Sequence, residues 1–145
     1  MERTSIVSCV LDTTDPTAEL GFEAWLNNHK FFDCDHVKNR QQIFVEFDDI
    51  PASHELKFVL KHKTLDHTKL DVHGNIVSDS LLTMANLEIN GIKLDKIFTE
   101  HAIYTHNFNG TTVSTQQKFY GEMGCNGTVS FKFTTPFYLW VLEHM

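Results

Sequence analysis

An Asn-Gly pair at positions 90 and 91 lies between two short segments in which apolar and charged residues alternate. Asn-Gly supplies the two positive φ angles of a type I′ turn, and so short a turn fixes the register of the strands that it joins. In that register Ile89 lies opposite Ile92, and Glu88 lies opposite Lys93 on the other face. The segment 87–94 is therefore predicted to be a half-buried β-hairpin.

Similar alternation recurs along the chain and predicts further strands. In the segment 55–63, for example, Leu56, Phe58 and Leu60 share one face. The other strand-like segments are 5–11, 42–47, 102–108, 111–114, 119–123, 128–133 and 138–143, with Asn-Gly turns also expected at Asn109-Gly110 and Asn126-Gly127. No helix is predicted between these strands, and the last of them, after Pro136, is expected to be central to the core.

The segment 15–32 is open to two interpretations. Asp15-Pro16 could begin a helix that carries Phe22, Trp25 and Leu26 at helical spacing. The stretch 21–26 also alternates as a strand does, and Asn27-Asn28 could turn it back into a second strand at 30–32. We favour the hairpin interpretation.

Composition agrees with a fold made of strands. Val, Ile, Thr, Phe, Tyr and Trp make up about a third of the chain, and these residues fit a pleated, half-buried surface. A chain of 145 residues has the usual size of one domain. We therefore predict an all-β fold in a single domain, residues 1–145, with two packed antiparallel sheets in a jelly-roll-like sandwich.

Charge and apolar runs exclude several classes of partner. The formal net charge is -7, and no Lys/Arg-rich run is present, so nucleic acid is not an expected partner. The apolar runs are too short to span a bilayer. The three cysteines, Cys9, Cys34 and Cys125, have no motif spacing and are expected to be small buried hydrophobes in a protein made in the cytoplasm. A virion component assembled inside a bacterial cell would have the same features.

Catalytic motifs are not found in the sequence. The chain has nine histidines, but no two of them are one residue apart on a strand with a downstream Glu, as in a metal-binding cupin. Nucleophile elbows, phosphate-binding glycine loops and Cys/His/Asn arrangements are absent as well. The protein is therefore predicted not to be an enzyme.

The polar segment 64–79 is the candidate metal site. It contains Asp66, Asp71, Asn75 and Asp79, whose oxygen atoms are the kind of ligand that Ca²⁺ takes from an irregular loop. The alternative is that the carboxylates are simply solvated and that His73-Gly74-Asn75 forms a turn. Calcium is thus the one candidate cofactor.

Aromatic side chains are the other candidate binding residues. Trp25, Tyr104 and Tyr120 could stack on sugar rings if they face outward. Trp25 lies opposite the apolar face of its predicted strand, so it is the aromatic residue most expected to be exposed.

Several stretches resemble small uncharacterised proteins of T4-like marine phages such as cyanophages. These stretches are His54-Glu55-Leu56-Lys57-Phe58, Asn75-Ile76-Val77-Ser78-Asp79, Asn90-Gly91-Ile92-Lys93-Leu94, Lys118-Phe119-Tyr120-Gly121 and Trp140-Val141-Leu142. The strand pattern is also similar to that of β-sandwich carbohydrate-binding modules, including calcium-dependent ones. The first resemblance implies that the protein comes from a virus, is made in the host cytoplasm and is associated with the virion.

Two functions follow as hypotheses. One is a non-catalytic binding module for carbohydrate, with a glycan as the partner. The other is a structural or assembly protein of the virion, which packs against other virion proteins and has no small ligand. An exposed Trp25 beside a groove would favour the first, and a large apolar patch would favour the second.

Overall fold

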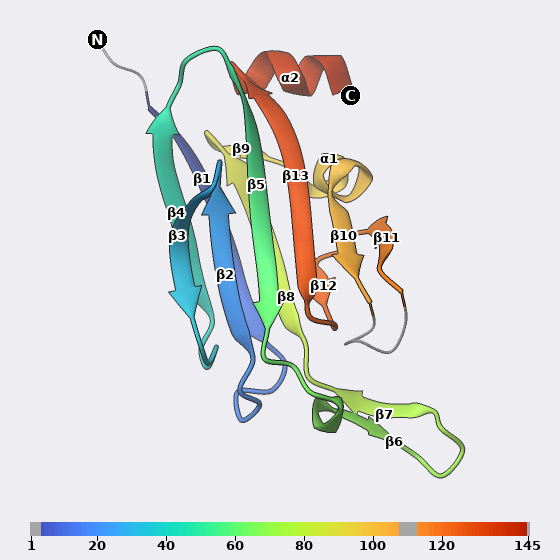
Figure 1. Ribbon diagram of the computed structural model, residues 1–145. Coiled ribbons are helices and arrows are strands. Elements are labelled where there is room, and N and C mark those ends of the chain that lie inside the picture. The colour runs from blue at the N-terminus through green and yellow to red at the C-terminus, as the bar shows by residue number, and fades with distance from the viewer. Residues whose placement is uncertain (1–3, 108–112, 145) are drawn as a thin grey trace.

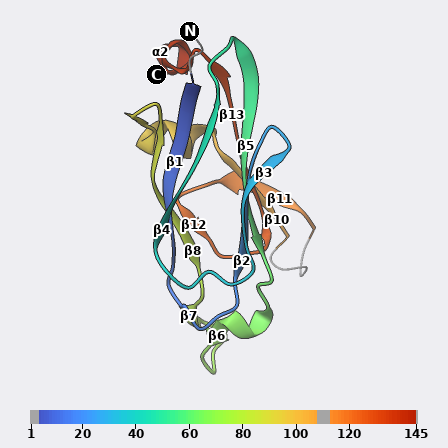
Figure 2. The same ribbon diagram turned by 90° about the vertical axis from the view of Figure 1, so that its left-hand side faces the viewer.

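The computed structural model describes residues 4–107 and 113–144. These residues form two large antiparallel sheets that pack face to face, with a small hairpin at one end of the molecule and a helix at the other (Figure 1 and Figure 2). The predicted all-β, two-sheet sandwich is confirmed. Within the described residues, no helix is long and apolar enough to cross a membrane.

Each sheet brings together strands that are far apart in the sequence. Sheet A has the order β12-β8-β1-β4, with β9 paired to β8, and sheet B has the order β11-β10-β13-β5-β2-β3. The strands of sheet A are β1 (Thr4–Thr13), β4 (Gln41–Asp48), β8 (Leu82–Ile89), β9 (Ile92–Lys93) and β12 (Glu122–Met123). The strands of sheet B are β2 (Gly21–Leu26), β3 (His29–Cys34), β5 (Ala52–Lys61), β10 (Ile103–His106), β11 (Thr115–Lys118) and β13 (Gly127–Thr135).

Two of the predicted asparagine turns, at 27–28 and 90–91, form hairpins. Asn90 and Gly91 have φ of 53° and 77°, and Ile89 pairs with Ile92 in the expected register. Asn27 and Asn28 have φ of 51° and 69° and join β2 to β3, so the hairpin interpretation of 15–32 is confirmed. In both places the local turn residues determine which strands become neighbours.

The core lies between the sheets and is rich in phenylalanine. Phe22, Phe58 and Phe131 come from the three central strands of sheet B and are at most 1% exposed. The opposing face of sheet A contributes Leu11 and Ile89, which are fully buried. Burial of each such side chain stabilises the fold by about 1.5–3 kcal/mol. Cys9 is also buried here, and desolvation raises the pKa of its thiol to about 12.

The segment predicted as an irregular loop is instead a short hairpin that projects from one end of the sandwich (Figure 1). A single 3₁₀ turn (Leu65–His67) leads into β6 (Thr68–Leu70), which pairs with β7 (Ile76–Asp79). We call residues 68–79 the β6–β7 arm. Gly74, with φ of 80°, lies in the turn expected at its tip.

The structure has two helices where the sequence predicts a strand or a loop. The strand predicted at 138–143 is wrong, because the chain forms α2 (Phe137–His144) after Pro136. Phe137 and Trp140, three residues apart, face the core, whereas Tyr138 and Leu142 are exposed, so the burial period is helical. A second helix, α1 (Asp95–His101), was not expected at all.

The strands predicted between 102 and 123 are shorter or shifted. The structure has β10, β11 and β12 in this stretch, and Asn109-Gly110 lies outside the described residues. Asn126 precedes β13, but its side chain bonds to both backbone groups of Lys63, at 2.9 and 2.8 Å, and does not close a hairpin. The preceding β12 belongs to sheet A, so this connection crosses between the two sheets.

Candidate functional site

The outer face of sheet B carries a hollow around Trp25. Period-two alternation in β2, β5 and β13 sends large apolar side chains into the core and polar ones outward. The registers place Trp25, Lys57 and Ser130 in one row across these three strands. The hollow has a volume of about 400 Å³ and is lined by Glu23, Trp25, Asn28, Glu55, Lys57, Val59, Thr128 and Ser130. We call it the Trp25 hollow.

Polar contacts hold the Trp25 side chain in the sheet face. Its indole Nε1 donates a hydrogen bond of 2.9 Å to Glu23 Oε1, and Lys30 Nζ lies 5.6 Å from the ring centroid. Lys61 Nζ donates to the other oxygen of Glu23 at 3.0 Å. The hydrogen bonds from Lys61 and Trp25 lower the pKa of Glu23. The ring is therefore positioned before any ligand arrives.

Glu55 is the polar centre of the same face. Ser130 Oγ donates to Glu55 Oε2 at 2.6 Å, and Lys57 Nζ lies 3.4 Å from Oε1. The bond from Ser130 and the charge of Lys57 lower the pKa of Glu55. Because both Glu23 and Glu55 have a lysine partner, the hollow presents hydrogen-bonding groups without a large excess of either charge.

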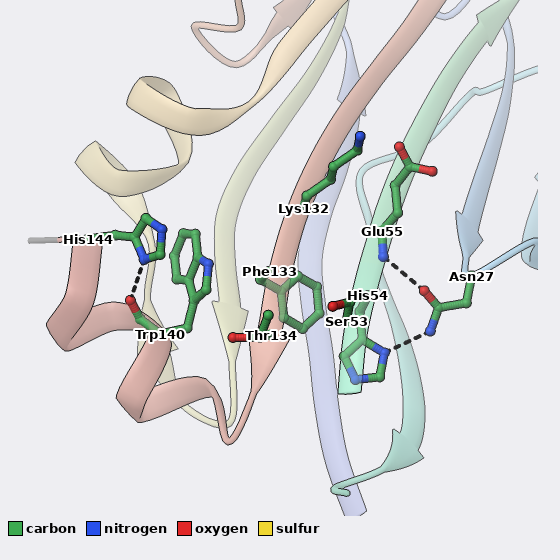
Figure 3. A pocket seen from close by; sticks show the side chains of 9 residues that line it. All are labelled: Asn27, Ser53, His54, Glu55, Lys132, Phe133, Thr134, Trp140 and His144. Carbon is green, nitrogen blue, oxygen red and sulfur yellow. Dashed lines mark hydrogen bonds between the residues drawn. The ribbon is translucent and has the colours of Figure 1, made fainter. Parts of the chain in front are cut away.

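A second hollow shares Glu55 with the first. Figure 3 shows the residues that line this second hollow. The second hollow has a volume of about 500 Å³ and is lined by Asn27, Ser53, His54, Glu55, Lys132, Phe133, Thr134, Trp140 and His144. Trp140 and His144 come from α2, and their rings stack with centroids 4.1 Å apart. Glu55 therefore links the lining of the Trp25 hollow to that of the hollow beside α2.

Asn27 and His54, which both line the second hollow, belong to one hydrogen-bonded chain. The Asn27 side chain accepts a bond from Glu55 N–H at 2.8 Å, and its Nδ2 lies 2.7 Å from His54 Nδ1 (Figure 3). His54 Nε2 lies 3.0 Å from Thr135 Oγ1, which in turn donates to the carbonyl of Ile50. Because Asn27 Nδ2 and Thr135 Oγ1 have these roles, His54 is neutral and carries its proton on Nε2.

Histidines line a further hollow, which is bounded by Glu19, Asp35, His62 and His67 among others. His62 Nε2 lies 3.6 Å from Asp35 Oδ1, and His67 Nδ1 accepts a bond from Thr64 N–H. Across residues 4–107 and 113–144, no three His, Cys, Asp or Glu side chains are grouped so as to hold a metal ion.

The three aromatic candidates from the sequence have different environments. Trp25 is half-buried in its hollow. Tyr104 is only 3% exposed, and its hydroxyl bonds to the backbone of Cys125, so it belongs to the core and not to a stacking surface. Tyr120 is 76% exposed but lines neither hollow of the sheet B face.

The four oxygen-bearing candidates are not all brought together. Asp71 Oδ1 accepts the backbone N–H of Asn75 and of His73, and these two bonds lower the pKa of Asp71. Asp79 Oδ1 instead accepts from the buried Lys63 ammonium at 2.6 Å. Two of the three carboxylates that were predicted to hold calcium, Asp71 and Asp79, therefore have protein donors as partners.

Asp66 and Asp79 line one hollow at the base of the arm, together with Asp15. Asp15 is itself bonded to the hydroxyls of Thr17 and Ser80, at 2.6 and 3.0 Å. These contacts agree with the alternative interpretation of solvated and internally bonded carboxylates. The residues as placed here do not fit a Ca²⁺ ion, which needs six to eight oxygen ligands around one point.

Sequence reasoning missed most of the residues around Trp25. The alternation in 55–63 puts Lys57 on the face opposite Leu56, Phe58 and Leu60. Local pattern does not indicate, however, that β5 pairs with β13, which brings Ser130 beside Glu55. The alternation within β13 could have placed Ser130 outward. Which strand pairs with β13 could not be predicted from the local sequence pattern.

Comparison with solved structures finds a similar fold in vCBM60. Its selenomethionine form, described with circular permutation between two families of calcium-dependent carbohydrate-binding modules, has a TM-score of 0.52 and 8% sequence identity, over 88% of this chain and 89% of that chain. A complex of vCBM60 with galactobiose has a TM-score of 0.49 and 10% identity, over 87% of this chain and 96% of that one. No protein-family model matches the chain, and neither does a curated protein. The similarity is one of fold.

Proposed function

We propose that the protein is a non-catalytic carbohydrate-binding module whose glycan lies across the outer face of sheet B. The observation that carries this proposal is the fixed, half-buried Trp25 ring in a hollow lined by hydrogen-bonding side chains. An amphipathic ring offers an apolar face to a sugar ring, and the neighbouring polar groups can exchange hydrogen bonds with its hydroxyls. The sandwich fold shared with vCBM60 supports the same proposal.

The bonding of His54 in the second hollow supports a positioning role for this histidine and not a catalytic one. Both of its ring nitrogens are bonded to protein groups. A general base needs a free nitrogen within hydrogen-bond reach of its substrate. Calcium is not part of the proposed site, because Asp66, Asp71, Asn75 and Asp79 lie on and before the β6–β7 arm and line neither of its hollows.

The test is binding of a panel of neutral and acidic oligosaccharides, galactobiose among them, followed by calorimetry with the best binder. Trp25→Ala should weaken binding by about tenfold or more, because a stacked aromatic contact is worth ~0.5–1.5 kcal/mol beyond its buried area. Tyr120→Ala is the control, since it removes an exposed aromatic ring outside both hollows. Equal losses for the two variants, or no binding to any member of the panel, would contradict the proposal.

A second candidate function is packing against other virion proteins of a T4-like phage. It is favoured by the large apolar side chains that the β6–β7 arm exposes to solvent. Leu70, Val72, Ile76 and Val77 are between 58% and 96% exposed. Origin in a phage, synthesis in the host cytoplasm and association with the virion remain predictions, and mass spectrometry of purified virions would test the last of them.

A further inference from the structure

His54 connects the glycan-binding face to the inside of the sandwich. Asn27 closes the turn that follows Trp25, and its backbone N–H donates to the carbonyl of Glu55 at 3.0 Å. Its side chain holds the N–H of Glu55 and the Nδ1 of His54. The Asn27 side chain therefore joins the turn after Trp25 to Glu55 in β5, in addition to the backbone bonds between β2 and β5, and the orientation of that side chain depends on His54.

Protonation of His54 is incompatible with this arrangement. A proton on Nδ1 would point at Asn27 Nδ2, which is also a donor, across a distance of 2.7 Å. Asn27 cannot present its oxygen instead, because Oδ1 accepts the bond from Glu55 N–H. An imidazolium would thus break either the contact of Asn27 with His54 or its contact with Glu55.

The surroundings of His54 provide one charged group that would attract the imidazolium. Rings of Phe47 and Phe133 pack on its two sides, with centroids 4.9 and 5.2 Å away. The charge of Asp49 acts on His54, and within the described part of the chain the buried Oδ1 of Asp49 has no hydrogen-bond partner. Glu55 points outward to Ser130 and Lys57, while His144 and Lys132 line the same hollow from α2 and β13.

We propose that neutral His54 is a positioning residue, which holds Trp25, Asn28 and Glu55 in place through Asn27, and that acidification therefore releases the glycan. This inference rests on the proposed function. In the protonated state the imidazolium is drawn toward Asp49, and the side chain of Asn27 loses one of its two contacts with β5, which loosens the β2–β3 turn beside Trp25.

The direction of the pH effect follows from the environment of His54. Burial lowers its pKa from the ordinary value of 6.5, and the charge of Asp49 partly opposes this. The folded protein therefore binds a proton less readily than the unfolded chain, and His54 becomes charged only below its ordinary range. Glu23 and Lys30 beside Trp25 do not titrate there, because hydrogen bonds lower the pKa of Glu23 and raise that of Lys30.

The first experiment measures the fluorescence of Trp25 without ligand, in a Trp140→Phe background that leaves one tryptophan. Emission should change as the pH falls below about 6.5, with the midpoint set by His54. His54→Gln should abolish the transition, and Asp49→Asn should shift it to lower pH. His29→Gln is the matched control, since it removes an exposed histidine beside the same turn. A transition that survives His54→Gln, or its absence from the parent protein, would overturn the proposal.

The second experiment measures glycan affinity by calorimetry at about pH 8 and at about pH 5. The affinity at the lower pH should be about tenfold weaker, as expected for the loss of one hydrogen bond. His54→Gln should remove this pH dependence. An unchanged affinity in the parent protein would overturn the proposal. Absence of glycan binding at both pH values would contradict the proposed function, and the fluorescence transition would still decide whether His54 positions Trp25.

Discussion

At the scale of single residues, one buried ammonium fixes the base of the β6–β7 arm. The side chain of Lys63 is fully buried, and its Nζ lies 2.6 Å from Asp79 Oδ1. Thr68 Oγ1 donates to the same oxygen at 2.7 Å. A buried charge is tolerated only when it is paired and hydrogen-bonded, so Asp79 neutralises Lys63 and is not free to bind a cation.

Asp79→Ala should lower the free energy of unfolding by about 3–5 kcal/mol, because it leaves the Lys63 ammonium buried without its partner. Urea unfolding followed by circular dichroism provides the measurement. The control is Asp71→Ala, which removes an exposed carboxylate of the same arm and should leave global stability nearly unchanged. A small effect at Asp79 would show that water already reaches Lys63.

At the scale of elements, the Asn90-Gly91 turn stabilises the whole sandwich because it is tied to the central strand of sheet A. Ile6 N–H donates to Asn90 Oδ1 at 2.9 Å, and Asn90 Nδ2 donates to Ser5 Oγ at the same distance. The turn of the β6–β7 arm has no comparable role, since the arm pairs only with itself among the sheets described.

Gly91→Ala should therefore destabilise the protein by about 1 kcal/mol, the cost of placing a side chain at positive φ. Gly74→Ala is the matched control: it also lies at positive φ, and in both places an added Cβ would meet no atom within 4 Å. The strain at Gly74 should loosen the arm without changing the midpoint of global unfolding in urea. Similar shifts for both variants would show that the arm unfolds together with the sandwich.

The helices and strands differ in how well they could be predicted from the sequence. Turns at 27–28 and 90–91 were predictable because φ is set by the turn residues themselves. In α2 the run from Phe137 to Leu142 is almost entirely apolar, so it fits a strand as well as a helix. The spacing of Leu94, Phe98 and Ala102, all buried and four residues apart, was the signal for α1. The site required the register of β5 with β13, which no local pattern contains.

At the scale of the whole molecule, similarity of the sandwich fold does not imply similarity of the binding site. The similarity to vCBM60 extends over most of both chains at 8% identity, so it shows the fold alone. The site proposed for this chain rests instead on Trp25, Glu55 and their neighbours. For the kind of ligand that this face could bind, the ion pairs of Lys57 with Glu55 and of Lys61 with Glu23 are therefore more informative than the net charge of -7.

Calcium provides a test at this scale. Thermal melts in chelator and in excess calcium should give the same melting temperature, because the candidate oxygens of Asp71 and Asp79 are bonded to protein donors. An ion bound only by the folded state would add ~2.7 kcal/mol at a hundred times its dissociation constant, so a site would be seen. A calcium-dependent rise that Asp79→Ala abolishes would show that the arm rearranges around the ion.

The strand order of sheet B also determines when the proposed binding face can form during synthesis. β5 has β2 on one side and β13 on the other, and β13 occupies residues 127–135. Until the ribosome has made β13, one edge of β5 stays open, with its backbone groups unpaired. The row of Trp25, Lys57 and Ser130 is therefore completed only once β13 has been made, and termination before residue 127 should leave an aggregation-prone half-sheet instead of a weaker module.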